Sequence, residues 1–515
     1  MNLKKYIPFL SLITVLFCFQ NLNSQSFNGY ALYNLQNQNT TYLIDDQGNI
    51  AHNWSCSSSC NYTVLLKENG NIVRGTKYNN NQLNGAAVGG KIQELDPNAN
   101  VVWEYVYSNS DHVSHHDITL LPNGNVILTA WEVKSTAELI QAGFDNPSSE
   151  KWPTHFVELQ QNGTSADIVW EWHIWDHLIQ DHDPTKDNYG IVANHPELMD
   201  INAVSGGGGP GGGGPGGGGP GGGGGDWFHV NGVDYNEDLD QLVFSSRFAS
   251  EIFIIDHSTT TAEAAGHTGG NSGMGGDFLY RWGNPSNYGS SASQTIPNAV
   301  HDPRWIKDDG RPLGGYIQYF NNSGAPGGGS TVEAIQAPEN GYLYNFSGNS
   351  YGPANYDFQH VCLASANGQS ASDAMSNGNI FVNVSQNYMY EVDQTGNVVW
   401  QYNAGPTKAF RYECDHPGII ALLGEDPCGL LSVSEQTLSK INIYPNPSNG
   451  IFLIDGFILG ENSLSVKIID VFGKVVLETK NSLNLDLTNF EDGVYFVSLN
   501  FNNEKEIVRK ISLIR

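Results

Sequence analysis

The sequence has few basic residues for its length. Among 515 residues, 24 are Lys or Arg and 53 are Asp or Glu, so the formal net charge is −29 at pH 7. Such an acidic chain lacks the basic surface that binds nucleic acid or anionic lipid, and we expect neither as a partner. An anionic substrate would have to be attracted by a local cluster of cations.

Long hydrophobic runs are also scarce. Only the N-terminus has one, where Lys4 and Lys5 precede the apolar residues 7–19 and then small and polar residues. This run is shorter than the roughly 20 residues of a membrane-spanning helix, and its pattern is typical of a secretory signal peptide. We expect a signal peptide at 1–24, cut near Ser24 or Gln25; the alternative is a buried strand.

Cysteine is rare as well. Of six cysteines, Cys18 would leave with the signal peptide. An exported protein can form disulfides, so Cys56 could pair with Cys60 and Cys414 with Cys428, which would leave Cys362 over. The sequence does not determine this connectivity.

Helical periodicity is almost absent, and a β-pattern recurs instead. Asn-Gly between apolar residues predicts a hairpin, and each copy is followed by a strand, a turn and a strand that ends in Trp plus an aromatic residue. The hairpin phrases are 65–73, 120–128 and 374–382, and the following phrases are 92–105, 156–172 and 389–402.

Together the two phrases form a tryptophan-bearing unit of about 45 residues, which is typical of a β-propeller blade. Weaker copies run over 30–54, 227–283 and 301–346. We therefore predict an all-β, six-bladed propeller over 25–428; a pair of β-sandwiches is the alternative, and the repeat argues against it.

Two segments depart from the repeat. Residues 205–225 are rich in Gly and Pro, which predicts a disordered insert in a surface loop. After a polar linker at 429–440, a compact all-β domain, predicted to be a small β-sandwich, occupies 441–515.

The C-terminal domain carries YPNPSNG (444–450), VKIIDVFGKVV (466–476), DGVYFVSL (492–499) and a closing VRKISLIR. It resembles the C-terminal sorting domain of Bacteroidetes type IX secretion cargo. The resemblance implies a secreted or cell-surface protein, with the type IX machinery as a partner and the tail either cleaved or anchored.

One predicted hairpin, Asp226–Arg247, carries His229 and Arg247. A histidine can exchange a proton near neutral pH, and an arginine offers a fork of donors to an oxyanion. Other histidines also start the first strand of a unit: His115 or His116, His301 and His360. First strands line a propeller's central channel, so we expect these side chains to converge, although a lone histidine is more often structural.

The motifs HHDITLLPNGN, WEWHIWDHL, DWFHVNGVDYNEDLDQLVFSSR, FLYRWGNP, HDPRWI with GGYIQYFNN, and NGNIFVN resemble the PAPS-independent arylsulfate sulfotransferases. The resemblance implies transfer of a sulfuryl group from a phenolic sulfate ester to a phenol through a sulfohistidine, without a cofactor. It makes His301 the nucleophile, with His229, Arg247 and His116 as further catalytic residues; His115 is the alternative to His116.

The stretch 171–184 contains His173, His177, His182 and Asp183. Their spacing matches no standard zinc site, and 183–190 lacks the acidic pattern of a calcium loop, so we predict no metal. Because one fold hosts many functions, two alternatives stay open. One is a non-catalytic surface propeller that binds a glycan or protein, and the other is a propeller hydrolase or lyase.

Overall fold

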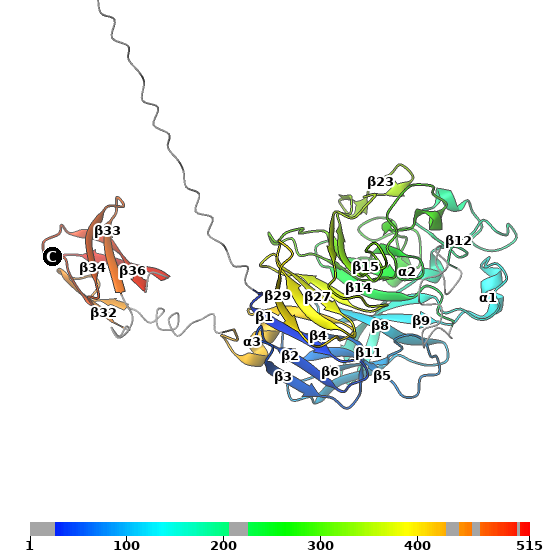
Figure 1. The fold of residues 1–515 in the computed structure, drawn as a ribbon, viewed down its shortest axis with the longest axis horizontal. Coiled ribbons are helices and arrows are strands. Elements are labelled where there is room, and N and C mark those ends of the chain that lie inside the picture. Colours follow the sequence, from blue (N-terminus) through cyan, green and yellow to red (C-terminus); the bar gives the residue numbers. More distant parts are fainter. Residues whose placement is uncertain (1–25, 205–224, 429–441, 456–463, 502–504) are drawn as a thin grey trace, which may run out of the picture. The chain divides into compact units, whose positions relative to one another are not determined.

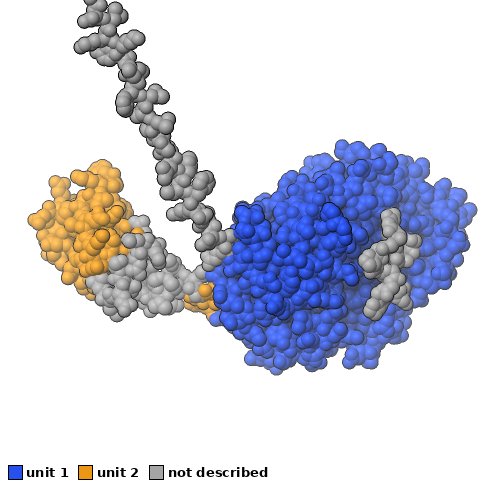
Figure 2. All heavy atoms as spheres, viewed as in Figure 1, with its two compact units in different colours: residues 1–423 blue, residues 424–515 orange. Residues whose placement is uncertain are grey.

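The computed structural model describes residues 26–204, 225–428, 442–455, 464–501 and 505–515. The chain divides into two compact units, residues 1–423 and 424–515, coloured blue and orange in Figure 2. The predicted signal peptide, the linker and nearly all of the Gly-rich insert lie outside the described residues. Among the helices of the described part, none is long and apolar enough to cross a membrane.

Six four-stranded antiparallel sheets build the described part of the first unit (Figure 1). Five of them use four strands in chain order: β4 (Cys60–Leu66), β5 (Ile72–Lys77), β6 (Gly90–Leu95), β7 (Val101–Val106); β8 (His112–Leu120), β9 (Val126–Glu132), β10 (Thr154–Asn162), β11 (Ser165–His173); β14 (Val230–Asn236), β15 (Gln241–Ser246), β16 (Glu251–Asp256), β17 (Tyr280–Trp282); β18 (Val300–Trp305), β19 (Ile317–Asn321), β20 (Thr331–Ile335), β25 (Phe358–Val361); and β26 (Ala371–Ala374), β27 (Ile380–Val384), β28 (Tyr388–Val392), β29 (Val398–Tyr402). The sixth sheet joins the two ends of the unit: β30 (Ala409–Glu413), β1 (Gly29–Asn34), β2 (Thr40–Ile44), β3 (Ile50–Ser55).

One strand from each sheet lies at the centre of the unit. These inner strands, β4, β8, β14, β18, β26 and β30, contact one another in this order, and β30 returns to β4. The last of them, β30, pairs antiparallel with β1, so the end of the unit closes the ring onto its beginning. Four-stranded sheets repeated around a centre are the architecture of a β-propeller, and the predicted propeller fold is confirmed.

The tryptophans of the repeat explain how neighbouring sheets are held together. Four of them lie on the outer strand of a sheet and donate the indole N–H to the next sheet or its connections. The pairs are Trp54 to the Asp96 carbonyl (3.0 Å), Trp103 to the Ser165 carbonyl (2.8 Å), Trp170 to the Thr259 hydroxyl (3.1 Å) and Trp282 to the Pro353 carbonyl (2.7 Å).

The core lies between the sheets. β15 is buried along its whole length, because both faces of its sheet pack against neighbours. Between the β8–β11 and β14–β17 sheets, the Phe244 ring lies 5.1 Å from Phe156 and 5.2 Å from Phe253 (ring centroids). Burial of each such side chain contributes about 1.5–3 kcal/mol, which makes the inter-sheet layers the main source of stability.

The Asn-Gly phrases form the predicted hairpin turns. Gly70 joins β4 to β5, Gly124 joins β8 to β9, and Gly378 joins β26 to β27. All three glycines have a left-handed φ of 84–87°, a conformation that side chains with a Cβ rarely adopt.

Helices are few in the described part, as expected. The remaining elements of the first unit are short: α1 (Thr136–Gln141), η1 (Ile174–Asp176), β12 (Leu178–Ile179), η2 (Val192–Asn194), β13 (Met199–Asp200), α2 (Thr261–Ala264), η3 (Pro285–Tyr288), β21 (Glu339–Asn340), β22 (Leu343–Tyr344), β23 (Phe346–Ser347), β24 (Ser350–Tyr351) and α3 (Pro417–Leu423).

The second unit has two antiparallel sheets around one apolar core, as predicted for the tail. One sheet contains β31 (Asn442–Tyr444), β32 (Ile451–Asp455) and β35 (Asn484–Asp486). The other contains β34 (Val475–Lys480), β33 (Leu464–Asp470), β36 (Gly493–Phe501) and β37 (Lys505–Leu513), in that order.

Two predictions were wrong. Cys56 and Cys60 do not pair: both are free and buried, and their thiols donate instead to the Trp54 carbonyl (3.4 Å) and the Thr63 carbonyl (3.6 Å). Cys414 and Cys428, in contrast, are disulfide-bonded. The fifth repeat unit does not end near Phe346, because its fourth strand is β25. His360 therefore lies on an outer strand and not at the start of an inner one.

Candidate functional site

The inner strands share a local irregularity. β4, β8, β14 and β18 each break register with the next strand, between Cys60 and Val64, Ser114 and Ile118, Val230 and Gly232, and His301 and Arg304. Bulges of this kind redirect side chains and are common beside active sites. Here they occur where the chain carries Tyr62, His115–Asp117, Asn231 and Asp302.

The predicted hairpin is confirmed, and it carries His229 and Arg247 at its open end. β14 pairs with β15, and the Arg247 backbone N–H donates to the His229 carbonyl (3.1 Å). His229 has a left-handed φ of 53°. Its ring Nδ1 lies 2.5 Å from the Asp226 Oδ2, and its backbone N–H donates to the Asp226 Oδ1 (3.0 Å). Asp226 therefore fixes the ring and leaves Nε2 for a ligand.

His301 is buried, and its orientation is set by the backbone. Its Nδ1 lies 2.9 Å from the Ala299 carbonyl oxygen, which can only accept a hydrogen bond. Nδ1 therefore carries the proton, and the lone pair is on Nε2. Burial, reinforced by the positive charge of Arg247, holds the pKa of His301 well below 6.5. A neutral imidazole with a lone pair on Nε2 is the form that attacks an electrophile.

His116 lies closer to the other site residues than His115 does. Its ring centroid is 4.8 Å from that of His229 and 5.3 Å from that of Tyr62. His115 instead stacks on Trp131 at 3.9 Å, and its Nδ1 is 2.7 Å from the His116 Nδ1. Burial lowers the pKa of both rings, that of His115 to about 3. This geometry favours His116 over His115 as the site residue.

Arg247 is a half-buried cation without a carboxylate partner. Its Nη2 donates to the Asn367 carbonyl (3.1 Å), and no acidic side chain of the described residues lies within ion-pair distance. A Cβ placed on Gly368 would lie 2.9 Å from Arg247 Nη1 and 3.9 Å from His301 Cε1. Arg247 and His301 therefore face the same small space, and the guanidinium can receive an anion there.

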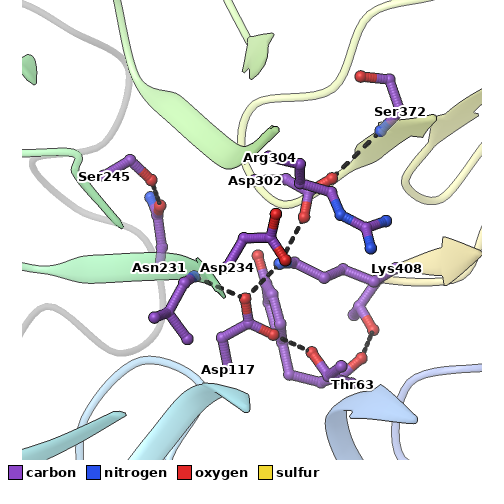
Figure 3. A network of polar contacts seen from close by, with 12 residues as sticks. Thr63, Asp117, Asn231, Asp234, Ser245, Asp302, Arg304, Ser372 and Lys408 are labelled. Carbon is purple, nitrogen blue, oxygen red and sulfur yellow. Dashed lines mark hydrogen bonds and ion pairs between the residues drawn. The ribbon is translucent and has the colours of Figure 1, made fainter. Parts of the chain in front are cut away.

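Two of the site histidines are each followed in the sequence by an aspartate of a buried ion network, which Figure 3 shows. Lys408, directly before β30, reaches between two carboxylates, 2.6 Å from Asp117 Oδ2 and 2.7 Å from Asp302 Oδ1. All three side chains are at most 3% exposed. Since Asp117 follows His116 and Asp302 follows His301, the network ties two site histidines to the strand that closes the ring.

Tyr62, on β4, completes the inner wall. Its ring lies 5.6 Å from Lys408 Nζ, and its hydroxyl is buried without a hydrogen-bond partner. Burial, together with the charges of Asp117 and Asp302, raises its pKa. Tyr62 therefore stays a neutral phenol that can donate to a bound ligand.

Replacing Lys408 with methionine is expected to destabilise the first unit by about 3–5 kcal/mol, because two buried carboxylates would lose their counter-ion. Urea unfolding followed by tryptophan fluorescence measures this loss. The matched control is Lys91→Met, which breaks the ion pair with the partly exposed Glu104 and should cost at most about 1 kcal/mol. Equal stability losses in the two variants would contradict the role assigned to the network.

Comparison with known proteins identifies the family. The arylsulfotransferase (ASST) family matches residues 16–339, more than half of the chain. The chain belongs to the arylsulfotransferase family. The secretion system C-terminal sorting domain matches residues 442–514, which confirms the predicted sorting tail and indicates export to the cell surface or beyond.

Individual relatives of this arylsulfotransferase-family chain are distant. Ulvan lyase NLR42 of Nonlabens ulvanivorans is 32% identical over 88 residues, which is 16% of each chain, so the match covers far less than two thirds of that protein. A structure of a protein of unknown function from Bacteroides caccae is 10% identical, covers 75% of this chain and 98% of its own, and has a TM-score of 0.38. The structure of the Dos1 propeller is 8% identical, covers 95% of this chain and 93% of its own, and has a TM-score of 0.30.

The structure thus brings together His116, His229, Arg247 and His301, and it leaves His360 apart, hydrogen-bonded to the Tyr390 hydroxyl (2.9 Å). Sequence reasoning missed Asp226, Tyr62 and Lys408. A signal existed for Asp117 and Asp302, because each directly follows a site histidine in a repeated His-Asp pair.

Proposed function

We propose that this member of the arylsulfotransferase family is an exported enzyme that moves a sulfuryl group from a phenolic sulfate ester to a phenolic acceptor in two steps. The observation that supports this most strongly is the pairing of a neutral, buried His301 with Arg247, a cation that has no carboxylate partner among the described residues. A nucleophile beside a guanidinium that is not neutralised by a carboxylate of the described residues suits attack on an anionic ester.

In the first step, the lone pair of His301 Nε2 forms a bond to sulfur while the bond between sulfur and the aryl oxygen breaks. The oxygen leaves with the electron pair and takes a proton from His229, which Asp226 orients. Arg247 holds the peripheral sulfate oxygens as charge develops on them. In this proposal His116 and Tyr62, whose rings lie 5.3 Å apart, also contact the sulfate ester.

In the second step, the acceptor phenol gives its proton to His229, and its oxygen attacks sulfur. The bond between sulfur and Nε2 then breaks, and His301 is neutral again. The reaction conserves the sulfuryl group and needs no nucleotide donor, which suits a protein outside the cell.

Incubation with 4-nitrophenyl sulfate, with and without added phenol, tests the proposed function. A sulfotransferase should release 4-nitrophenol repeatedly only when phenol is present and should form phenyl sulfate in equal amount. Continuous release without phenol would make the protein a hydrolase. No release with any of a panel of aryl sulfates would favour a non-catalytic binding propeller.

The first step is expected to keep its rate as the pH falls below 6.5. Because the pKa of His301 is lowered, its neutral form persists at pH values where an ordinary histidine is protonated. Single-turnover release of 4-nitrophenol should therefore show no decline between about pH 7.5 and about pH 5.5. An acid limb centred near pH 6.5 would contradict the lowered pKa.

The Arg247→Met variant probes the cause of this shift. As the pH is lowered, the residual rate of this variant should begin to fall at a higher pH than the wild-type rate does. The reason is that removing the positive charge of Arg247 raises the pKa of His301. An unchanged acid limb would mean that Arg247 does not act on His301.

A further inference from the structure

A second cluster of histidine and carboxylate side chains lies outside the candidate site. His177 follows η1, while His267 and Asp277 belong to the connection between β16 and β17. The Nδ1 atoms of both histidines lie 2.8 Å from Asp277 Oδ1, and the three ligand atoms lie within 4.8 Å of one another. Among the described residues, none of the three forms a hydrogen bond or an ion pair with a residue of the His301 site.

The His177 ring is also held by contacts on the side away from Asp277. Its Nε2 lies 2.8 Å from the Ala264 carbonyl oxygen, and its ring is parallel to that of Trp172, with 5.6 Å between the ring centroids. The Trp172 indole in turn donates to the Gly276 carbonyl (2.7 Å). A histidine that gives one ring N–H to a backbone carbonyl and presents the other nitrogen to a cluster has the second-shell arrangement of a metal ligand.

Hydrogen-bond accounting points the same way. The Ala264 carbonyl oxygen accepts a hydrogen bond, so His177 Nε2 carries a proton and Nδ1 is the ring nitrogen that faces Asp277. The Nδ1 atom of His267 lies at the same buried oxygen, Asp277 Oδ1. A cation bound between the two nitrogens and the carboxylate would use all three atoms as ligands.

We propose that His177, His267 and Asp277 bind a divalent transition-metal ion, with Zn²⁺ as its probe. Two imidazole nitrogens and one carboxylate form a donor set that zinc accepts, with a fourth position left for water. His177 is fully buried and Asp277 nearly so, whereas the His267 side chain is 59% exposed, so the ion enters from the His267 side. The ion would join two connections whose ligands are 100 residues apart.

Metal binding to the purified, tag-free protein tests this site independently of any enzyme activity. Dialysis against Co²⁺ should give the visible absorption of a low-coordinate nitrogen and oxygen site, and Zn²⁺ should displace the Co²⁺. Zn²⁺ affinity is then measured by competition with a chromophoric chelator. His267→Ala and Asp277→Asn should each weaken binding by at least about 10-fold, the loss that even a second-shell change causes.

His195→Ala is the matched control. His195 is also exposed and lies 2.9 Å from a carboxylate, that of Glu197, but it belongs to no three-ligand group among the described residues. Its Zn²⁺ affinity should equal that of the wild type. No Zn²⁺ binding by the wild type, or equal binding by the wild type, His267→Ala and Asp277→Asn, would overturn the proposal. His267 is on the surface, so its variant should fold normally.

Discussion

Replacing His301 with alanine is expected to reduce sulfuryl transfer from 4-nitrophenyl sulfate by about 10³-fold or more, because the reaction loses its nucleophile. The variant should still fold, since the only ring hydrogen bond of His301 seen in the described part of the chain goes to the carbonyl of Ala299, two residues earlier. Steady-state rates with saturating phenol measure the loss, and urea unfolding checks the fold.

His360→Ala is the control for this result. His360 lies on the outer strand β25 and bonds to the Tyr390 hydroxyl, away from the candidate site. Its activity should equal that of the wild type. Full activity in His301→Ala would contradict the assigned nucleophile, and loss in His360→Ala alone would move the site to another part of the propeller.

Replacing Arg247 with alanine is expected to reduce the rate of the first step by roughly 10²–10³-fold, because the transition state loses its main source of positive charge. The effect should fall on the rate of bond breaking more than on donor binding. Pre-steady-state release of 4-nitrophenol at several donor concentrations separates the two.

Arg247→Lys distinguishes charge from geometry. Lysine keeps the charge but lacks the planar fork of donors, so this variant should recover part of the rate and not all of it. Stability should change little in both variants, because Arg247 makes one hydrogen bond to a backbone carbonyl and no ion pair in the described part of the chain. A first step unaffected by Arg247→Ala would show that the sulfate binds elsewhere.

The sequence predicts most of the fold because its repeat encodes local structure. Asn-Gly turns and tryptophan-ended strands identify sheets without any long-range information, and they place His229 and Arg247 on one hairpin. His360 shows the limit of this reasoning. The two short hairpins between β20 and β25 delay the fourth strand, so a histidine that looks like the start of a unit is on its outer edge.

The rest of the candidate site depends on closure of the ring. Lys408 reaches Asp117, 291 residues away, only because β30 becomes the inner strand of the sheet that begins the unit. No local pattern around Lys408 signals this pairing. Tyr62 was missed for a related reason, since it is one of many aromatic residues on strands and only its buried hydroxyl without a partner distinguishes it.

The most direct test of the account is the mass of the protein after reaction with 4-nitrophenyl sulfate in the absence of any acceptor. We expect one equivalent of 4-nitrophenol in a burst and a gain of about 80 Da, the mass of a sulfuryl group, as a covalent intermediate accumulates. Peptide mapping should locate the gain on His301, and added phenol should remove it. A burst without an adduct, or an adduct on another residue that persists in His301→Ala, would contradict the central claim.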